Sequence, residues 1–249
     1  MKIQVLPLSL VAASLAGVLF AVTVPTIPWK TGDRSRPLPP KVDPGGATTA
    51  PSDAVVLFDG KDLSAWQQKN GQPAAWTVEN GYFAVKPRSG DLVTKQAFGD
   101  AQMHIEWASP TPPRGKDQEP GNSGVYLQSL YEIQVLESNQ NVTYPDGQAG
   151  AIYCQYPPLV NPSRPAGEWQ TYDIIFHGPR FDSAGQLTRL ATVTLLFNGV
   201  LAQDHTSPTG PTDYMKRPPY KPGPDKLPLL LQDHGQPVKY RNIWIRELK

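Results

Sequence analysis

The chain has 249 residues, and its 23 Lys and Arg side chains nearly balance its 22 Asp and Glu side chains, giving a formal net charge of +1. This balance, without a cluster of Lys and Arg among aromatic residues, argues against nucleic-acid binding, which needs a positive field. The 28 prolines and 21 glycines indicate many turns and little long helix, so we expect an all-β chain with one sizeable core.

An apolar run follows Lys2 and extends to about residue 24. One positive charge before such a run is typical of a secretory signal peptide, or of an N-terminal anchor that stays uncleaved. We therefore predict export to the periplasm or the extracellular space, with membrane contact only through residues 1–24 if they are not removed. The single cysteine is Cys154, far from this run, so we do not expect a lipoprotein or an internal disulfide.

Residues 25–51 are rich in Pro, Gly, Thr and Ser, which predicts a disordered linker. We expect the folded domain to span residues 52–249, beginning with a short apolar strand at residues 55–58. Two further runs, residues 76–79 and 82–85, flank Asn80-Gly81, which is a strong hairpin signal. The large aromatic residues of this part are more readily explained as core residues than as sugar-stacking platforms.

The next strand, residues 103–107, alternates between apolar and polar side chains. Met103, Ile105 and Trp107 point to one side of it. His104 and Glu106 point to the other side, close enough to share a ligand or each other's charge. A solvated strand face is the commoner reason for such a pair, and a functional role depends on a second polar row in the same sheet.

The stretch from Gly121 to Glu137, GNSGVYLQSLYEIQVLE, contains two alternating runs around a short break and predicts a β-hairpin. One face of the hairpin is apolar, while Tyr126, Gln128, Glu132 and Gln134 form a polar row on the other. Such a row either faces solvent or forms a site for a polar ligand. The glycines at the entry of the hairpin permit a close approach of backbone and ligand.

Two loops are expected at the rim of the domain, in residues 109–120 and 141–156, and the second is predicted to become a strand at residues 151–154, which contains Tyr153 and Cys154. Strands follow at residues 168–176 and 191–197, the latter ending at an Asn-Gly turn. Residues 227–248 predict two strands that meet near His234-Gly235. Gln232 and His234 share a face if the first of these strands continues that far.

Several blocks carry a resemblance to a known family: LFDGKDLSAW, WTVENG, FGDAQMHIEW, GNSGVYLQSLYEIQVLES, DGQAGAIY, GEWQTYDIIF and LLLQDHGQPVKYRNIWIREL. In this order, from about Ser52 to Lys249, the chain resembles the 3-keto-disaccharide hydrolase family, long catalogued as a domain of unknown function. The resemblance implies a two-sheet β-jelly roll sandwich of the concanavalin A-like lectin and glucanase type, acting on a carbohydrate substrate.

A ketone at sugar carbon 3 acidifies the hydrogen on carbon 2. A base can then remove it, the group on carbon 1 can leave by elimination, and addition of water gives net hydrolysis. We expect Glu132 or His234 to act as the base and Glu106 or His104 as the proton donor. The substrate-binding candidates, which would orient sugar hydroxyls, are Asn122, Gln128, Gln134, Tyr153, Gln232 and Arg241.

Two other functions remain open at this level. A conventional glycosidase would need two carboxylates. The spacing of Glu132 and Glu137 resembles the E-x-D-x-x-E strand of glucanases, but Gln134 stands where that strand has its middle acid. Glu106 would then have to supply the second carboxylate. A non-catalytic carbohydrate-binding module is the third reading. No compact metal-ligand spacing links His104, Glu106 and His234, so we assign neither a metal nor a cofactor.

Overall fold

The computed structural model describes residues 27–46 and 48–248, and the chain divides into two units, residues 1–41 and 42–249. The predicted signal peptide or anchor at residues 1–24 lies outside the described residues. Residues 27–41 of the first unit contain turns and bends but neither helix nor strand. No helix in the described part of the chain has the length and apolar character needed to cross a membrane.

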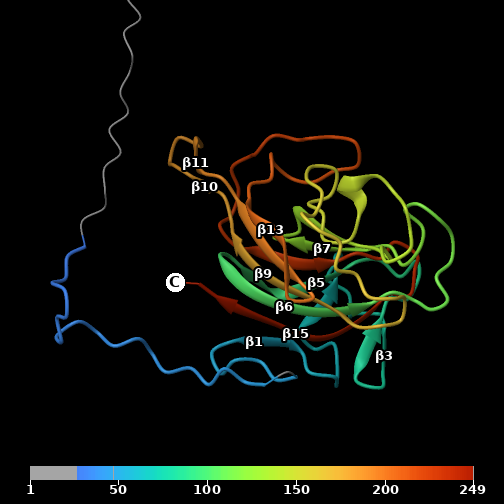
Figure 1. Cartoon of the computed structure of the whole chain (residues 1–249), viewed down its shortest axis with the longest axis horizontal. Helices are drawn as coiled ribbons and strands as arrows, with labels where there is room; N and C mark the ends of the chain where they lie inside the picture. The colour runs from blue at the N-terminus through green and yellow to red at the C-terminus, as the bar shows by residue number, and fades with distance from the viewer. Residues whose placement is uncertain (1–26, 47, 249) are drawn as a thin grey trace, which may run out of the picture. The chain divides into compact units, whose positions relative to one another are not determined.

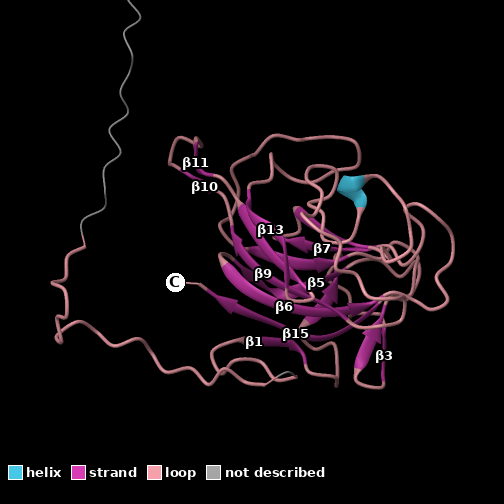
Figure 2. Ribbon diagram, in the orientation of Figure 1, coloured by secondary structure: helices cyan, strands magenta, loops and turns pink. Residues whose placement is uncertain are grey.

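The second unit is built almost entirely of β-strands (Figures 1 and 2). Its one described helical element is a short 3-10 turn, η1 (Pro145–Gly147). Two large antiparallel sheets pack against each other as a β-jelly roll sandwich, so the all-β prediction is confirmed.

The larger sheet has eight strands, and the smaller main sheet has five. The larger sheet runs in the order β13 (Val200–Thr206), β12 (Thr192–Phe197), β9 (Gln170–His177), β6 (Ala101–Ala108), β15 (Lys239–Glu247), β4 (Tyr82–Ala84), β3 (Thr77–Glu79), with β1 (Val55–Phe58) also paired to β15. The smaller sheet runs in the order β2 (Trp66–Gln68), β5 (Leu92–Phe98), β14 (Leu227–Leu231), β7 (Ser123–Leu127), β8 (Tyr131–Val135). A separate two-stranded ribbon pairs β10 (Arg180–Phe181) with β11 (Leu187–Arg189).

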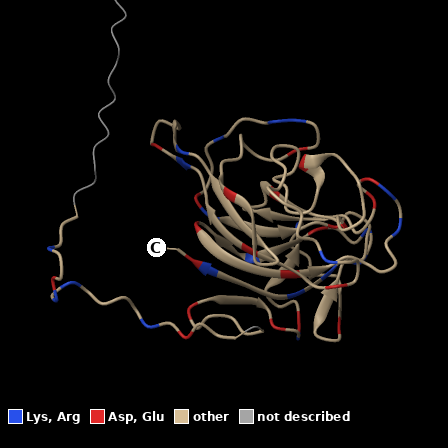
Figure 3. Cartoon of the chain, in the orientation of Figure 1, with Lys and Arg blue, Asp and Glu red and all other residues tan. Residues whose placement is uncertain are grey.

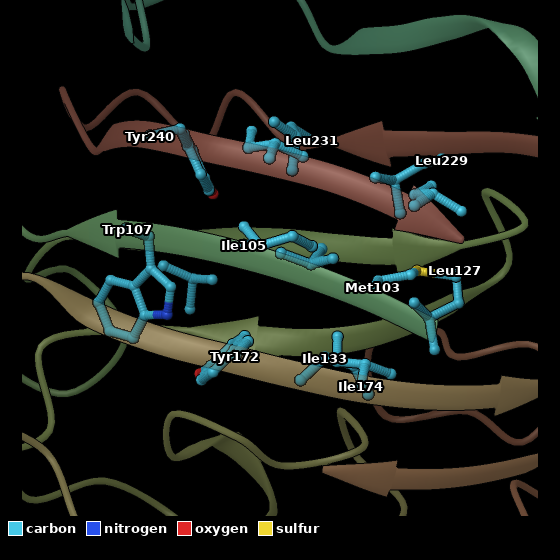
Figure 4. Close-up of a cluster of buried hydrophobic side chains, with 14 of the residues drawn as sticks. Met103, Ile105, Trp107, Leu127, Ile133, Tyr172, Ile174, Leu229, Leu231 and Tyr240 are labelled. Carbon is cyan, nitrogen blue, oxygen red and sulfur yellow. The ribbon is translucent and has the colours of Figure 1, made fainter. Parts of the chain in front are cut away.

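The core lies between the two main sheets, where the alternation of each strand places its apolar side chains (Figure 4). From the larger sheet, Met103, Ile105 and Trp107 point inward, and from the smaller sheet Leu127 and Ile133 meet them. Burying one large apolar side chain fully contributes roughly 1.5–3 kcal/mol. A shift of one residue in either strand would exchange the apolar and polar faces, so this core fixes which side chains point outward.

Two predicted hairpins are confirmed in their turn geometry. Asn80 and Gly81 have φ of 47° and 78° between β3 and β4, and Asn198 and Gly199 have φ of 51° and 78° between β12 and β13. Positive φ at both central residues is the type I′ arrangement that matches the twist of paired strands. Trp66, Trp76 and Phe83 belong to the core, and the Trp66 indole nitrogen donates to the Leu57 carbonyl at 2.9 Å.

Charged side chains occur at separate points along the second unit, with Lys and Arg interspersed among Asp and Glu (Figure 3). This distribution matches the near-neutral composition of the chain. The site described next is therefore defined by individual polar side chains rather than by a broad field of one sign.

Candidate active site

A pocket of about 540 Å³ lies over the outer face of the five-stranded sheet, opposite the face that forms the core. Its volume is in the range of small-molecule sites. Strands β7 and β8 supply part of its lining, and three loops and the turn after β14 supply the rest. The lining residues are Asp117, Gln118, Asn122, Tyr126, Glu132, Gln134, Tyr144, Tyr153, Thr212, Asp213, Tyr214, Gln232 and His234.

The floor of the pocket is formed by Glu132 and Gln134 of β8, whose neighbours Ile133 and Val135 point into the core. Both floor side chains are buried, at 4% and 1% exposure. The amide of Gln134 lies between Gln118 and Glu132, 2.8 Å from Gln118 Oε1 and 3.2 Å from Glu132 Oε1. The polar row therefore does not face bulk solvent but forms the floor of a pocket.

A chain of hydrogen bonds fixes the carboxyl group of Glu132. The hydroxyl of Tyr126 donates to Glu132 Oε2 at 2.8 Å, and Gln232 Nε2 donates to the same hydroxyl at 3.1 Å. The other amide atom of Gln232, Oε1, is buried without a hydrogen-bond partner among the described residues. A buried acceptor without a partner at the wall of a pocket is a position that a ligand hydroxyl can satisfy.

Burial raises the pKa of Glu132 to about 8. The hydrogen bond from Tyr126 opposes this shift, and the nearby carboxylate of Asp91 adds to it. Desolvation acts in this direction because it disfavours the charged form of a carboxyl group. A carboxyl group whose pKa lies near neutrality can take up or release a proton at working pH, which suits acid or base chemistry.

Gly124 of β7 makes room for this carboxyl group. A Cβ atom at this position would collide with Glu132 Oε1 and would lie 2.7 Å from the Tyr126 ring. The glycine is required here for the close approach of a side chain, not for an unusual backbone conformation. The glycine at this position therefore belongs to the site as much as the acid does.

One wall of the pocket is built from two loops that are tied together. The N–H of Asp117 donates to Asn141 Oδ1 at 3.1 Å, and Asn141 Nδ2 donates back to the Asp117 carbonyl at 2.7 Å. The hydroxyl of Thr143 donates to the Asp117 carboxylate, and Gln118 Nε2 donates to Thr143 Oγ1 at 2.9 Å. Asp117 has φ of 59°, in the left-handed region that residues other than glycine adopt less often. The hydrogen bonds with Asn141 and Thr143 hold its backbone there.

Another part of the wall comes from the proline-rich segment before β14. Its Thr212 is anchored to β8, because the N–H of Glu132 donates to Thr212 Oγ1 at 2.9 Å. Asp213 and Tyr214 follow it and also line the pocket. Tyr144 and Tyr153 add an aromatic side, with their hydroxyls 2.7 Å apart.

His234 and Asn122 complete the lining at the turn after β14 and at the entry to β7. The Asp233 side chain accepts from the N–H of Gly235 at 2.9 Å and of Gly90 at 3.0 Å, which fixes the turn that carries His234. His234 is exposed at the rim, whereas Asn122 is buried and donates to the Gln118 carbonyl at 2.6 Å.

Six of the ten predicted site residues therefore meet in this pocket: Asn122, Glu132, Gln134, Tyr153, Gln232 and His234. Their roles in catalysis and binding stay predictions. The other four, His104, Glu106, Gln128 and Arg241, lie elsewhere.

The expectation that His104 and Glu106 share a sheet with Glu132 is wrong. Strand β6 belongs to the eight-stranded sheet and β8 to the five-stranded sheet. Because Ile105 and Ile133 both point into the core, the polar side chains beside them point outward from opposite sides of the sandwich. His104 and Glu106 can therefore not be the proton donors for a reaction at Glu132.

Arg241 is likewise removed from the pocket and binds Glu106. Its Nε donates to Glu106 Oε2 at 2.7 Å, and Asn242 Nδ2 donates to Glu106 Oε1 at 2.8 Å. The pairing of β15 with β6 contains a β-bulge here, and Asn242 has φ of 44°. The bulge turns the Asn242 side chain toward Glu106.

His104 completes this second cluster, with Nδ1 2.6 Å from Asp173 and Nε2 3.5 Å from Glu106. Burial opposes charging of the imidazole, but the hydrogen bonds to both carboxylates raise the pKa of His104 to about 9. For Glu106, burial is outweighed by the donors His104, Asn242 and Arg241, which hold the pKa at about 2. The cluster is a set of paired charges, and the partner of Asp173 is this histidine.

Gln128 leaves the polar row because its backbone turns. It has φ of 52° at the start of the β7–β8 turn, and its Nε2 donates to the Asp225 carbonyl at 2.7 Å. Glu137, the second acid of the glucanase-like spacing, accepts from the N–H of Asn139 at 2.9 Å and does not line the pocket. The strand therefore carries one acid of the site, not two.

The pocket also contains lining residues that were not among the predicted site residues, including Tyr126, Asp117, Gln118, Thr212 and Asp213. Tyr126 belongs to the predicted polar row, and its place on the same sheet face as Glu132 is the signal that could have made it a candidate. The others lie on irregular segments, where no periodicity indicates direction.

Within residues 27–46 and 48–248, no group of three or more His, Cys, Asp or Glu side chains is arranged to hold a metal ion. The predicted strand at residues 151–154 is wrong, because Tyr153 and Cys154 lie in a turn and Cys154 has φ of 55°. The side chain of Cys154 is buried.

Residues 53–246 match the family described as the 3-keto-alpha-glucoside-1,2-lyase-like domain. The chain belongs to this family. The match covers every residue of the pocket, and it agrees with the resemblance to 3-keto-disaccharide hydrolases. No curated protein matches the chain significantly.

Solved structures similar to this 3-keto-alpha-glucoside-1,2-lyase-like domain include a candidate glycosyl hydrolase from Parabacteroides distasonis ATCC 8503. It is 48% identical, the alignment covers 88% of this chain and 95% of that one, and the TM-score is 0.84. A second candidate glycosyl hydrolase from the same organism is 22% identical, with 79% and 94% coverage and a TM-score of 0.58, and it supports the fold alone. The family and the first of these structures support a glycosyl hydrolase function.

Proposed function

We propose that the chain cleaves 3-keto-disaccharides or related 3-keto-glycosides by proton abstraction and elimination, followed by addition of water. The observation that carries the proposal is the buried carboxyl group of Glu132 on the floor of the pocket, held by Tyr126 and with its pKa raised to about 8. A desolvated carboxylate is a stronger base than one in water, and only one such base is needed.

In this reaction Glu132 removes the proton from carbon 2, and the electron pair moves toward the carbon 3 oxygen to give an enolate. As the enolate collapses, the bond from carbon 1 to the leaving oxygen breaks, and that oxygen gains a proton. Donors near a developing oxyanion stabilise it. Asn122, Gln134 and Gln232 are close to the floor and supply amide groups for the ring hydroxyls and the enolate oxygen.

His234 is the candidate for protonating the leaving oxygen. It is exposed at the rim of the same pocket, where the bond to the leaving group would point outward. Tyr153 lies on the aromatic wall and offers a hydroxyl and a ring face to the sugar. This assignment replaces Glu106 and His104 with a group on the correct side of the sandwich.

We also propose that the protein is exported, on the basis of the apolar segment after Lys2. The test is cell fractionation of the source organism with an antibody against the folded domain. Recovery in the periplasmic or culture fraction is expected, and recovery only with cytoplasmic markers would contradict export.

The decisive experiment is product analysis after the purified chain is incubated in deuterated water with a 3-keto-disaccharide and, separately, with its unoxidised parent. We expect cleavage of the keto sugar alone, with deuterium at carbon 2 of the released 3-keto-sugar. Mass spectrometry and NMR give the product and the position of the label. A parallel sample of the product without enzyme corrects for spontaneous exchange next to the ketone.

Each other outcome points to a different function. Cleavage of the unoxidised parent would favour a conventional glycosidase with a second acid in the pocket. Cleavage of the keto sugar without deuterium at carbon 2 would count against proton abstraction at that carbon with exchange of the proton into solvent. Binding of sugars without any cleavage would favour a carbohydrate-binding module.

A further inference from the structure

The fixed charges among the lining residues of the pocket are of one sign, because Asp117 and Asp213 lie on two of its loops and no Lys or Arg is among the lining residues. Asp91 lies close enough to Glu132 to raise its pKa further. Lys116, which is exposed, directly precedes Asp117 in the chain, and Lys216 Nζ lies 3.3 Å from Asp213 in a solvent-exposed pair. Such exposed pairs are strongly screened and neutralise little.

The burial of the lining residues separates an inner from an outer part of the pocket. Glu132, Gln134 and Asn122 are buried on the inner side, whereas Asp117 and His234 are exposed at the rim. The reacting ring must place carbon 2 at Glu132, so the group attached to carbon 1 extends toward the rim. The leaving group therefore meets the carboxylates.

We propose that the rim is a leaving-group subsite that accepts neutral or cationic groups and rejects anionic ones, with Asp117 and Asp213 as the specificity-determining residues. This inference rests on the proposed function for the orientation of the substrate. It narrows the substrate class to 3-keto-glycosides whose leaving group carries no carboxylate, sulfate or phosphate.

The backbone of Asp117 at the rim is in a strained conformation. It lies in the left-handed region, and the reciprocal bonds with Asn141 together with the bond from Thr143 keep it there. Strained residues that are fixed in this way are concentrated at functional sites. About tenfold discrimination corresponds to about 1.4 kcal/mol. Two unit charges about 5–6 Å apart can supply this at the effective dielectric constant of a protein surface.

The test uses three 3-keto-glucosides whose leaving groups differ in one substituent. This substituent is neutral in the first compound, a carboxylate in the second and an ammonium group in the third. An aromatic ring and a methylene group separate it from the leaving oxygen in all three. We expect kcat/KM for the anionic compound to be about tenfold or more below that of the neutral one, and the cationic compound to equal or exceed it. Raising the salt concentration from about 20 mM to about 500 mM should reduce the difference, because the Debye length shortens.

Variants locate the effect. Asp117→Asn and Asp213→Asn should each reduce the discrimination about two- to threefold, since each removes one of the two negative charges among the lining residues at the rim. Asp204→Asn is the matched control, because it makes the same change of charge at an exposed position on β13, in the other sheet. Equal kcat/KM values for the neutral and anionic compounds would overturn the subsite and leave the proposed function intact.

A binding measurement keeps the two proposals separable. If none of the three compounds is cleaved, the proposed function fails, and calorimetric Kd values for the unoxidised glucosides with the same leaving groups decide the inference. Weaker binding of the anionic glucoside, restored in the Asp117→Asn and Asp213→Asn variants, supports it. Equal affinities, or no measurable binding of any of them, overturn it.

Discussion

Glu132 and Glu106 occupy comparable positions on opposite sheets, and yet they have opposite acid strengths. Each points outward from a strand whose neighbouring side chains fill the core, and their exposures are 4% and 6%. The pKa of Glu132 is raised to about 8, whereas that of Glu106 is lowered to about 2. Burial disfavours ionisation of both, so their partners make the difference.

Glu106 is surrounded by donors that favour its charged form, namely Arg241, Asn242 and His104. Glu132 receives a hydrogen bond from the neutral hydroxyl of Tyr126 and faces the negative charge of Asp91. The first arrangement stabilises a fixed ion, and the second keeps a carboxyl group poised to exchange a proton. Two carboxyl groups with similar exposed fractions can thus differ in function, one forming a fixed ion pair and the other suited to proton transfer.

The strongest test of this comparison replaces each acid by its amide. Glu132→Gln should lower turnover of a 3-keto-disaccharide by about 10²–10⁴-fold, the usual contribution of a general base. Glu106→Gln should leave kcat within about threefold while lowering the free energy of unfolding, because Arg241 loses its charged partner. Steady-state kinetics and urea unfolding measure the two effects. Full activity of Glu132→Gln would remove this residue from the mechanism.

The second test acts on Glu132 without touching it. Gly124→Ala should lower turnover by about tenfold or more, because the added methyl group must displace the Glu132 carboxyl group and the Tyr126 ring. Its effect on the free energy of unfolding should be smaller than its effect on turnover. The matched control is Gly199→Ala, at a hairpin turn with no atom within 4 Å of the added Cβ, which should strain the backbone and spare the kinetics.

The third test compares the pH dependence of stability. The pKa of Glu106 is lower in the folded chain than its usual 4.5, so its contribution to stability is present above about pH 4.5 and is lost as pH falls toward 2. The pKa of Glu132 is higher in the folded chain, so folding is favoured by its protonation below pH 4.5, and that advantage is lost as pH rises through 8.

Chemical unfolding between pH 3 and 9 will separate the two contributions. The decline of stability from about pH 4.5 to about pH 8 should be smaller in Glu132→Gln than in the unaltered chain, and the decline in acid should be smaller in Glu106→Gln. If Glu132→Gln does not change the slope of the free energy of unfolding above pH 4.5, the pKa of Glu132 is not raised in the folded chain.

The smallest expected effect is that of Tyr126→Phe, which removes the one hydrogen bond that lowers the pKa of Glu132. The rise of kcat/KM with pH, which we expect near pH 8, should move upward by about half a unit to one unit. A loss of activity at all pH values without a shift of the midpoint would indicate that the hydroxyl acts on the substrate instead.

The sequence allowed part of the site to be predicted, because the alternation of β7 and β8 is local. It placed Glu132 and Gln134 opposite Ile133 and Val135, as the structure has them. The sheet to which His104 and Glu106 belong depends on pairing between strands that are distant in sequence, and no local pattern reports it.

Irregular backbone accounts for the remaining differences. The alternation of β7 predicts a place for Gln128 in the polar row, but this residue follows the end of the strand and lies in a turn where its positive φ redirects the side chain. Asp117 and Asp213 lie on loops that meet only in the folded chain. Their position at one pocket follows from loop hydrogen bonds, for which composition offers no rule.

The reciprocal bonds between Asp117 and Asn141 have a consequence for how a ligand enters. They join two long loops into one body, which cannot open without breaking several hydrogen bonds at once. The segment of residues 212–216, which also lines the pocket, is attached to β8 through Thr212. Tyr214 and Met215 of this segment are largely exposed. We therefore expect the breathing motions that admit substrate to occur in this segment, and amide hydrogen exchange should be faster at residues 213–216 than at residues 117–118.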